Sequence, residues 1–329
     1  MSKGLAKGLI CVFGANGFLG HYVIRRLAKD GWRVRACVRR PHIAGDLKVM
    51  GAVGQIQLVQ ANVRYKKSVE QAVQNCDAVI NLAGILVEQG RQSFNAVHVL
   101  GAKNIAEAAQ GAGITNLVHL SALGVNIDDA DLDSASKYAS SKAEGEQAVL
   151  AAVPSADIVR PSILFGEGDG FFTRFAGLAN LTLALPLLGG GKTKFQPLYV
   201  DDLAEAVCKI TNQGSNGKTW ELGGAQTFTF KRLLQFTLEA IDKKRLLLPV
   251  PWAISSLMGV FGEVSGYVPL VKPFLTRDQV KLLKIDNVVS GNYPGLPDLG
   301  IEAETIDAIV PASLAHFRKY GQFHQAAAN

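Results

Sequence analysis

The sequence predicts an α/β protein with a doubly wound, Rossmann-like parallel sheet and a smaller C-terminal lobe. Over residues 1–165, short runs rich in β-branched residues alternate with segments whose apolar residues recur at helical spacing. A glycine-rich stretch lies between the first expected strand and the first expected helix, and the alternation loosens after Gly166. Strands that alternate with helices are typical of a parallel sheet with helices on both faces.

The elements of the first domain, residues 1–165, follow one another at short intervals. The expected strands are 8–15, 33–39, 56–63, 78–84, 116–123 and 156–166, and the expected helices are 18–30, 68–76, 92–112 and one around Tyr138. Residues 166–329 form the expected smaller lobe, with some segments returning to the main domain. Its clearest elements are a strand and helix within 195–211, a strand at 218–224 and a helix at 229–241.

Charge and cysteine content limit the classes of ligand. The net charge is +6, but residues 1–70 hold thirteen Lys/Arg against three Asp/Glu. A basic first half favours an anionic ligand or neighbour. Nucleic-acid binding is not expected, because the basic residues are dispersed and have no interleaved aromatic residues. The four cysteines are far apart in the sequence, so we expect small buried thiols and no metal site.

The N-terminus and one apolar run bear on membrane association. The N-terminal residues enter the first strand almost at once, which leaves no room for a secretory signal. Residues 246–262 carry no charge but are interrupted by Pro249 and Pro251, and they are short for a spanning helix. We expect this run to be a buried helix or one that lies on an apolar surface.

The stretch FGANGFLG is the first candidate for ligand binding. It places Gly14, Gly17 and Gly20 between the first strand and the first helix. Glycine lets the backbone turn tightly and approach a pyrophosphate, which then lies on the helix N-terminus. The expected phosphate-binding residues are Gly14, Asn16, Gly17, Phe18, Leu19 and Gly20.

The end of the second strand bears on the choice of cofactor. An acidic residue here usually binds the ribose hydroxyls of NAD, but this chain has Arg39 and Arg40, and no acid until Asp46. Two guanidinium groups suit a 2′-phosphate, so we expect NADPH (NADP) and regard NAD as less favoured. The alternative is a pair of solvated surface arginines.

Two further strand ends complete the expected cofactor site. Asn62 and Val63 end the third strand, where the adenine would lie, and Leu82, Ala83 and Gly84 end the fourth expected strand near the adenine-side ribose. Each of the two groups is weak evidence alone, and their order along the chain strengthens both.

Ser121, Tyr138 and Lys142 form the candidate catalytic group. Tyr138 and Lys142 are four residues apart, so a helix places both on one face. Ser121 could orient a carbonyl or hydroxyl, Tyr138 could transfer the proton, and the charge of Lys142 could lower the tyrosine pKa. The same trio would also serve to hold a cofactor without turnover, and both interpretations remain open.

These residues carry a family resemblance over about the first 210 residues. The stretches GANGFLG, NLAG, SALG, YASSK, RPSILFGEGD and PLYVDDLAEA resemble the extended and atypical short-chain dehydrogenase/reductase superfamily. Ser121, Tyr138 and Lys142 match its active-site serine and YxxxK pair, and the resemblance implies that Pro161 and Ile163 border the nicotinamide. One residue departs from the pattern: His98 stands where the family's proton relay usually has an asparagine.

The C-terminal half resembles one subfamily more narrowly. The stretches KPFLTRDQVKLLKIDNVVSG and LPDLGIEAETID are similar to the subfamily of the 39-kDa NADPH-binding accessory subunit of respiratory complex I and its bacterial relatives. The resemblance implies a bound NADPH with little or no turnover, complex I subunits as partners and possible peripheral membrane contact. The expected location is the cytoplasmic side of a bacterial inner membrane, or the matrix side of a mitochondrial one for a processed chain.

Three functions therefore stand at this point. The first is an accessory or assembly-related protein of complex I, which accounts for the C-terminal half, the paired arginines and His98. The second is a free NADP-dependent oxidoreductase acting on a small apolar carbonyl or alcohol, which accounts for the intact Ser121, Tyr138 and Lys142. The third is a nucleotide-sugar epimerase or dehydratase, which the fold permits but the two arginines do not favour.

Overall fold

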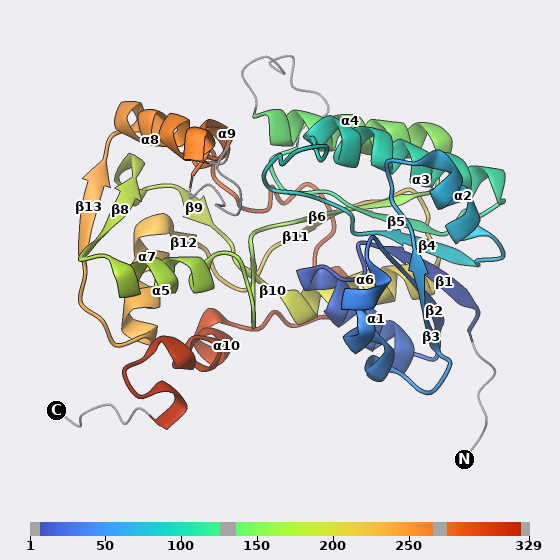
Figure 1. The fold of residues 1–329 in the computed structure, drawn as a ribbon, viewed down its shortest axis with the longest axis horizontal. Coiled ribbons are helices and arrows are strands. Elements are labelled where there is room, and N and C mark those ends of the chain that lie inside the picture. The colour runs from blue at the N-terminus through green and yellow to red at the C-terminus, as the bar shows by residue number, and fades with distance from the viewer. Residues whose placement is uncertain (1–6, 126–135, 266–274, 324–329) are drawn as a thin grey trace. The chain divides into compact units, whose positions relative to one another are not determined.

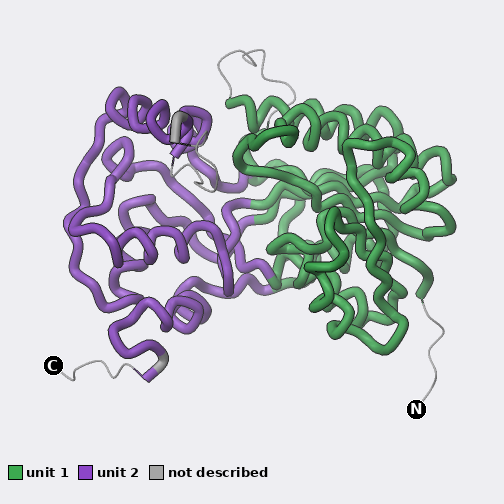
Figure 2. Tube along the Cα trace, in the orientation of Figure 1, with its two compact units in different colours: residues 1–161, 201–222, 291–301 green, residues 162–200, 223–290, 302–329 purple. Residues whose placement is uncertain are grey.

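The structure is a computed structural model that describes residues 7–125, 136–265 and 275–323. The chain divides into two compact units, each described here by itself (Figure 2). Unit 1 consists of residues 1–161, 201–222 and 291–301, and unit 2 of residues 162–200, 223–290 and 302–329. Two segments from the second half of the chain thus belong to unit 1. Residues 272–274, the start of the C-terminal stretch noted above, lie outside the described residues.

Unit 1 contains a seven-stranded sheet whose neighbouring strands all pair in parallel (Figure 1). In spatial order the strands are β11 (Thr219–Leu222), β6 (Asp157–Pro161), β5 (Leu117–Leu120), β4 (Ala78–Asn81), β1 (Leu9–Phe13), β2 (Arg33–Val38) and β3 (Ile56–Gln60). The strand order reverses at β1, which lies between β2 and β4, so the carboxyl ends of these strands flank the switch point where such sheets bind ligands. The predicted doubly wound parallel sheet is confirmed.

Helices cover both faces of this sheet (Figure 1). They are α1 (Phe18–Lys29), α2 (Lys66–Val73), α3 (Leu100–Gly111), α4 (Lys137–Ala152) and α6 (Val200–Gln213), with a π-helical turn at Asn95–Val99 before α3. One face carries α2, α3 and α4, and the other carries α1 and α6. A bidentate ion pair joins α1 to α6, because the Arg26 guanidinium donates to both carboxylate oxygens of Asp201 at 2.8 and 2.9 Å.

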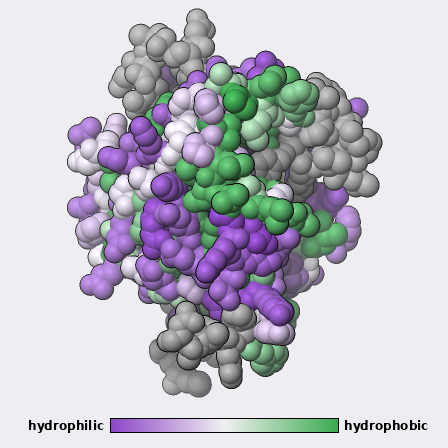
Figure 3. Space-filling model, turned by 90° about the vertical axis from the view of Figure 1, so that its left-hand side faces the viewer, coloured by the Kyte–Doolittle hydropathy of each residue, from purple (hydrophilic) through white to green (hydrophobic). Residues whose placement is uncertain are grey.

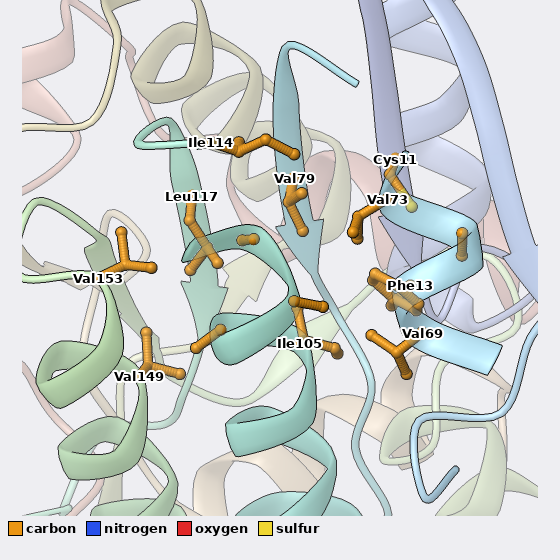
Figure 4. Close-up of a cluster of buried hydrophobic side chains, with 14 of the residues drawn as sticks. Cys11, Phe13, Val69, Val73, Val79, Ile105, Ile114, Leu117, Val149 and Val153 are labelled. Atoms are coloured by element: carbon orange, nitrogen blue, oxygen red, sulfur yellow. The ribbon is translucent and has the colours of Figure 1, made fainter. Parts of the chain in front are cut away.

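One apolar cluster of unit 1 lies between the sheet and the α2–α4 layer (Figure 4). Its strand residues include Phe13, Val79 and Leu117, and its helix residues include Ile105 and Val149, all almost completely buried. The strands are short and β-branched, and buried on both faces, which explains why they read as continuous apolar runs in the sequence. Cys11 lies in the same cluster as a small buried residue.

Unit 2 contains three pairs of short strands and five α-helices in its described part. The strands are β7 (Leu164–Phe165), β8 (Ala184–Leu188), β9 (Lys194–Phe195), β10 (Leu198–Tyr199), β12 (Phe228–Thr229) and β13 (Leu246–Val250), and the helices are α5 (Phe172–Leu181), α7 (Phe230–Ala240), α8 (Trp252–Ser265), α9 (Arg277–Leu282) and α10 (Ile306–Ser313). The pairs are β7–β10 and β8–β13, both parallel, and β9–β12, which is antiparallel. Phenylalanine rings are frequent in the core, where the ring centre of Phe171 lies 5.2 Å from that of Phe172 and 5.1 Å from that of Phe175.

Two segments differ from expectation. Residues 156–166 were expected to form one strand, but they form β6 in unit 1 and β7 in unit 2. Residues 246–262 form strand β13 and then helix α8, which begins just after Pro251. Pro249 is tolerated inside the two-stranded β8–β13 pair, whereas Pro251 follows the strand, and its fixed φ and missing N–H favour the change from strand to helix there.

Among the described residues, the helices lack the combination of length and apolar character needed to cross a membrane.

Candidate functional site

Glycines shape the turn between β1 and α1. Gly14 has φ of +79°, and a Cβ there would lie 2.8 Å from the carbonyl carbon of Leu82. The N–H of Gly17 donates to the carbonyl oxygen of Gly14 at 3.0 Å. A Cβ on Gly20 would lie 2.3 Å from the carbonyl oxygen of Ala15. These glycines therefore allow the turn to lie against both the end of β4 and the first turn of α1.

The start of α1 has the properties of an anion-binding site. The helix begins at Phe18, and Gly17 at the N-cap has no side chain to accept hydrogen bonds from the first N–H groups. Asn16 and Gly17 are exposed, whereas Leu19 and Gly20 are buried. The N-terminal N–H groups and the helix dipole favour a negatively charged group here. A pyrophosphate fits this geometry.

Positive charge lies at the same edge of the sheet. Arg39 and Arg40 directly follow β2, which pairs in parallel with β1, so they lie at the sheet edge that carries the glycine turn. Both are exposed, and the Arg39 guanidinium donates to the side-chain oxygen of Gln92. Asp46, the first acid after β2, has its carboxylate at 2.8 Å from Nε2 of His21, whose Nδ1 lies 2.9 Å from the carbonyl oxygen of Gly17.

The segments after β3 and β4 lie at that edge as well. Asn62 Oδ1 accepts from the N–H of Arg64 at 3.2 Å, and the Val63 carbonyl accepts from the Asn104 side chain at 2.8 Å. The N–H of Leu82 donates to Phe13 at the end of β1 at 2.9 Å. These bonds fix the two loops beside the glycine turn.

The loop after β4 reaches the candidate catalytic group. The N–H of Ala83 donates to Asn81 Oδ1 at 3.0 Å. A Cβ on Gly84 would lie 3.5 Å from Nζ of Lys142 and 3.7 Å from Nε2 of His98. Glycine at this position leaves the space beside both polar side chains open.

Helix α4 presents Tyr138 and Lys142 to the end of β5. Its N-cap is Ser136, whose side chain accepts from the N–H of Ala139 at 3.0 Å, so the helix starts directly before Tyr138. Lys142 is 4% exposed, and its Nζ donates to the carbonyl oxygen of Leu120 at 3.0 Å, next to Ser121. The structure therefore places Lys142 beside the residue that precedes Ser121, and Tyr138 lies one turn earlier on the same helix.

Close helix packing makes this placement possible. A Cβ on Gly145 would lie 2.4 Å from the carbonyl oxygen of His98. Only glycine allows α4 to approach the π-helical turn so closely, although glycine inside a helix costs about 1 kcal/mol relative to alanine.

Burial shifts the pKa values of Tyr138 and Lys142. Burial raises the pKa of Tyr138 to about 12, so the phenol is neutral and can donate a proton. Burial also lowers the pKa of Lys142 to about 8, and the negative charge of Glu146 offsets part of this shift. We expected Lys142 to lower the pKa of Tyr138, and the raised value differs from that expectation because desolvation of the phenolate outweighs any attraction.

His98 has both ring nitrogens engaged. The N–H of Ile85 donates to Nε2 at 3.0 Å, so the ring proton is on Nδ1, which donates to Ser141 Oγ at 2.9 Å. Ser141 in turn donates to the carbonyl oxygen of Tyr138 at 2.8 Å. Burial, together with the charge of Lys142, lowers the pKa of His98 to about 3. His98 is thus a neutral residue that ties the loop after β4 to the first turn of α4.

Two buried polar atoms near Lys142 are without a partner among the described residues. They are Oγ of Ser121 and Nε2 of His119. Nδ1 of His119 accepts from the Asn81 amide at 2.9 Å, so its Nε2 carries a proton. An unpaired buried donor is costly, and a ligand with a carbonyl or amide would satisfy the Ser121 hydroxyl. This fits a nicotinamide cofactor or a carbonyl substrate.

Sequence reasoning missed a buried ion pair beneath the trio. Glu146 is 0% exposed, and it accepts from the Arg160 guanidinium at 2.9 and 2.6 Å. The Arg160 guanidinium also lies 5.4 Å from the centre of the Tyr293 ring. The signal available in the sequence was spacing, because Glu146 follows Lys142 by four residues on the same helix face.

The last two predicted cofactor residues belong to different units. Pro161 ends β6 in unit 1, and its carbonyl accepts from the N–H of Leu123 at 3.0 Å. Ile163 lies in unit 2, where its N–H donates to Asn287 Oδ1 at 3.0 Å. The placement of Ile163 beside a nicotinamide stays a prediction.

Comparisons with known proteins identify relatives that extend over both units. Residues 10–223 match the model of the NAD dependent epimerase/dehydratase family. The chain is 33% identical over 312 residues to the mitochondrial NADH dehydrogenase [ubiquinone] 1 alpha subcomplex subunit 9 of Rattus norvegicus, covering 94% of this chain and 80% of the relative. It is also 36% identical over 228 residues to the ceramide reductase of Caulobacter vibrioides, covering 65% of this chain and 68% of the relative.

A solved structure is similar in fold. The crystal structure of gox2253 superposes with a TM-score of 0.72 at 21% identity and covers 96% of this chain and 100% of that one. At this identity the likeness concerns the fold alone.

Proposed function

We propose that this chain, which belongs to the NAD dependent epimerase/dehydratase family and to the same family as the mitochondrial NADH dehydrogenase alpha subcomplex subunit 9, is an NADPH-binding accessory subunit of respiratory complex I. The observation that carries the proposal is the extent of the similarity to that subunit, which spans 94% of the chain and thus includes unit 2. The proposed location is peripheral, on the cytoplasmic side of a bacterial inner membrane or the matrix side of a mitochondrial one.

The proposed cofactor is NADPH rather than NADH. Arg39 and Arg40 are exposed at the carboxyl end of β2 and offer two guanidinium groups to a 2′-phosphate. Asp46 is the nearest following acid, and its carboxylate is bound by His21. An acidic side chain that would repel the 2′-phosphate is therefore lacking directly after β2.

The residues of unit 1 have distinct proposed roles toward that cofactor. Gly14, Gly17 and Gly20 keep the backbone close to the pyrophosphate, and the N-terminal N–H groups of α1 bind it. The Lys142 ammonium donates one N–H to the Leu120 carbonyl, and its other N–H groups hold the nicotinamide ribose in this proposal. A bound nicotinamide dinucleotide supplies hydride chemistry, and Ser121 and Tyr138 are the groups that would orient a carbonyl and protonate its oxygen.

Two features support slow turnover. A Tyr138 phenol with a pKa of about 12 is a poor base at neutral pH, so alcohol oxidation would be disfavoured. His98 stands at the relay position of the resemblance, but Ile85 and Ser141 engage both of its ring nitrogens. A proton carried from bulk water would have to break one of these bonds.

Nucleotide binding and co-purification test the proposal together. The native protein should bind NADPH more tightly than NADH, and the Arg39→Ala, Arg40→Ala variant should lose most of that preference. Each charge-assisted contact contributes about 1.5–3 kcal/mol, so the preference should fall by about tenfold or more for each arginine. Gly17→Val should abolish binding of both nucleotides. A pull-down from detergent-solubilised membranes should recover respiratory subunits, and recovery of none would refute the accessory role.

A second function has one specific observation in its favour. The relative named ceramide reductase is 36% identical, and Ser121, Tyr138 and Lys142 are all present and assembled in this chain. On this alternative the chain is a free NADPH-dependent reductase of a long-chain, apolar ketone. NADPH oxidation with a panel of such ketones would decide, because the reductase predicts turnover that Tyr138→Phe abolishes with nucleotide affinity retained. An accessory subunit predicts no turnover above that of Tyr138→Phe.

A further inference from the structure

Helix α8 in unit 2 turns its small residues toward the protein. A Cβ on Gly259 would lie 2.7 Å from the backbone nitrogen of Arg277, and one on Gly262 would lie 1.9 Å from the carbonyl oxygen of Leu275. Ser255, on the same face, is 0% exposed. The spacing of these residues, four and then three, is that of one helix face. The face that packs on the protein is therefore centred on glycine and serine, and Met258 on the same face is partly buried against the core of unit 2.

Several large apolar residues of α8 face outward. Ile254, Leu257 and Phe261 are 53%, 56% and 68% exposed, and their spacing of three and four places them on one face. Val260 beside them is 37% exposed. In most surface helices the apolar stripe faces the core and polar residues face water. In α8 an apolar stripe faces water as well, in addition to the residues that pack on the core.

Strand β13 extends this surface. Its side chains alternate, so Leu247 packs against the core of unit 2 while Leu246 and Leu248 are 67% and 51% exposed. Leu183, which is 83% exposed, lies beside this strand, because its carbonyl oxygen accepts from the N–H of Leu246. Figure 3 views the side of the molecule where Figure 1 draws β13 and α8, and hydrophobic residues gather in its upper and central part, beside hydrophilic ones to the left and below. We call Leu183, Leu246, Leu248, Ile254, Leu257, Val260 and Phe261 the outer apolar face.

The borders of the outer apolar face are basic. Residues 246–262 are free of charged side chains, and Lys243, Lys244 and Arg245 directly precede them. The Lys284 ammonium lies 5.8 Å from the centre of the Trp252 ring at the start of α8. Between residues 243 and 285 the sequence has seven Lys/Arg and two Asp/Glu, and one of these acids, Glu263, is paired with Arg277 at 2.9 Å. Even with Asp242 and Asp286 at the two ends of this stretch, basic residues outnumber acidic ones around the apolar surface.

We infer that the outer apolar face rests on the surface of an anionic lipid bilayer. Apolar side chains enter the acyl boundary, lysine and arginine bind lipid phosphates, and tryptophan favours the interface between them. Helix α8 has 14 residues and is about 21 Å long, which is shorter than the hydrocarbon core of about 30 Å, so it lies on the bilayer rather than across it. This inference deepens the proposed peripheral location by naming the face and the lipid charge that would hold the protein there, but its evidence lies in unit 2 alone and applies equally to a free reductase.

Charge complementarity favours lipid over a protein partner or a second copy. Two copies that met through this face would place their basic borders against each other, which costs free energy. The outward side chains of α8 also offer a partner few hydrogen-bonding groups, whereas specific protein interfaces carry polar contacts among their apolar ones. A bilayer needs no complementary shape and supplies the negative charge.

Vesicle co-sedimentation of the full-length protein tests the inference. The native protein should bind phosphatidylcholine vesicles that contain phosphatidylglycerol, and bind pure phosphatidylcholine vesicles more weakly. The Leu257→Glu, Phe261→Glu variant should bind the anionic vesicles at least about tenfold more weakly. The Lys244→Ala, Lys284→Ala variant should lose about fivefold in affinity for the anionic vesicles for each charge removed, and this loss should be smaller at high salt. The matched control is Leu100→Glu, at an exposed helical position of unit 1, which should bind as the native protein does.

Other outcomes overturn the inference. Equal vesicle binding by the native protein and the Leu257→Glu, Phe261→Glu variant would exclude this face. If the native protein does not bind vesicles, the lipid surface is refuted. A dimer of the native protein that the Leu257→Glu, Phe261→Glu variant dissociates would then assign the face to a second copy. NADPH affinity, measured in parallel, separates the vesicle experiment from the test of the proposed function. The affinity for NADPH should be unchanged in all three variants. Gly17→Val should lose NADPH binding and still bind vesicles as the native protein does.

Discussion

Glu146 in unit 1 and Phe261 in unit 2 depart in opposite directions from the usual distribution of polar and apolar residues. The Glu146 carboxylate is 0% exposed and paired with Arg160, whereas the Phe261 ring is 68% exposed. A buried charge must be compensated inside the protein, and an exposed cluster of large apolar side chains indicates contact with something outside it. The first arrangement makes unit 1 sensitive to single polar substitutions, and the second should leave the stability of unit 2 almost independent of its outer apolar face.

The largest expected loss of stability follows from breaking the buried pair. Glu146→Gln leaves the Arg160 guanidinium buried without a counter-charge, and we expect a loss of about 3–5 kcal/mol in the free energy of unfolding. Urea denaturation measures it. The control is Glu239→Gln, which removes the Arg232–Glu239 pair, whose side chains are 46% and 60% exposed and whose loss should cost less than about 1 kcal/mol. Equal losses in the two variants would refute the contrast.

Acid should destabilise unit 1 through its buried histidines. The pKa of His98 and of His119 falls from 6.5 to about 3 on folding, because burial and the charge of Lys142 disfavour the imidazolium. The unfolded chain therefore binds protons more readily, and stability that is complete above pH 6.5 decreases as the pH falls toward 3. At a pH of about 4 we expect a loss of about 3 kcal/mol for each histidine.

Histidine variants separate this effect from the titration of carboxylates. The stability of His98→Asn should fall less steeply than that of the native protein between pH 6.5 and about 4. His42→Asn, at an exposed position, should keep the native slope. Denaturation curves at a series of pH values measure both, and parallel curves for His98→Asn and the native protein would contradict a buried neutral His98.

The fold of unit 1 could be predicted because its signals are local. Each strand is a short apolar run, each helix has its own periodicity, and the Gly14–Gly17 turn and the Tyr138–Lys142 spacing lie within a few residues. The connection from His98 to Ile85 and the pair of Glu146 with Arg160 depend on tertiary contacts. A single sequence shows which residues could make such contacts, but it does not show which residues are paired in the fold.

Unit 2 was harder to predict for a related reason. Residues 246–262 give an apolar run in which large and small residues alternate at helical spacing, and this pattern is the same whichever side faces the core. The contacts of Gly259 and Gly262 with the 275–277 backbone determine that the small side faces inward. The break of residues 156–166 into β6 and β7 was equally hidden, because both pieces are apolar and only their pairing partners differ.

A smaller effect should follow from enlarging the inward side of α8. Gly262→Ala places a Cβ 1.9 Å from the carbonyl oxygen of Leu275, so the helix must move, and we expect a loss of about 1–3 kcal/mol in the free energy of unfolding. Gly111→Ala, where the new Cβ would meet no atom within 4 Å, is the matched control and should be neutral or slightly stabilising. If both variants are neutral, α8 is not packed closely through its glycines.

The smallest expected effect belongs to the outward side of α8. Leu257 is 56% exposed, so Leu257→Ala should change the free energy of unfolding by less than about 0.5 kcal/mol. Leu233→Ala, at a completely buried position in the same unit, should cost about 2–5 kcal/mol. Thermal or urea denaturation of both variants measures the difference. A small cost at Leu257 would mean that folding does not require a large apolar residue there, which leaves contact outside the protein as the reason for it. A cost at Leu257 as large as at Leu233 would mean that the outer apolar face is covered in the free protein, and the contrast with unit 1 would fail.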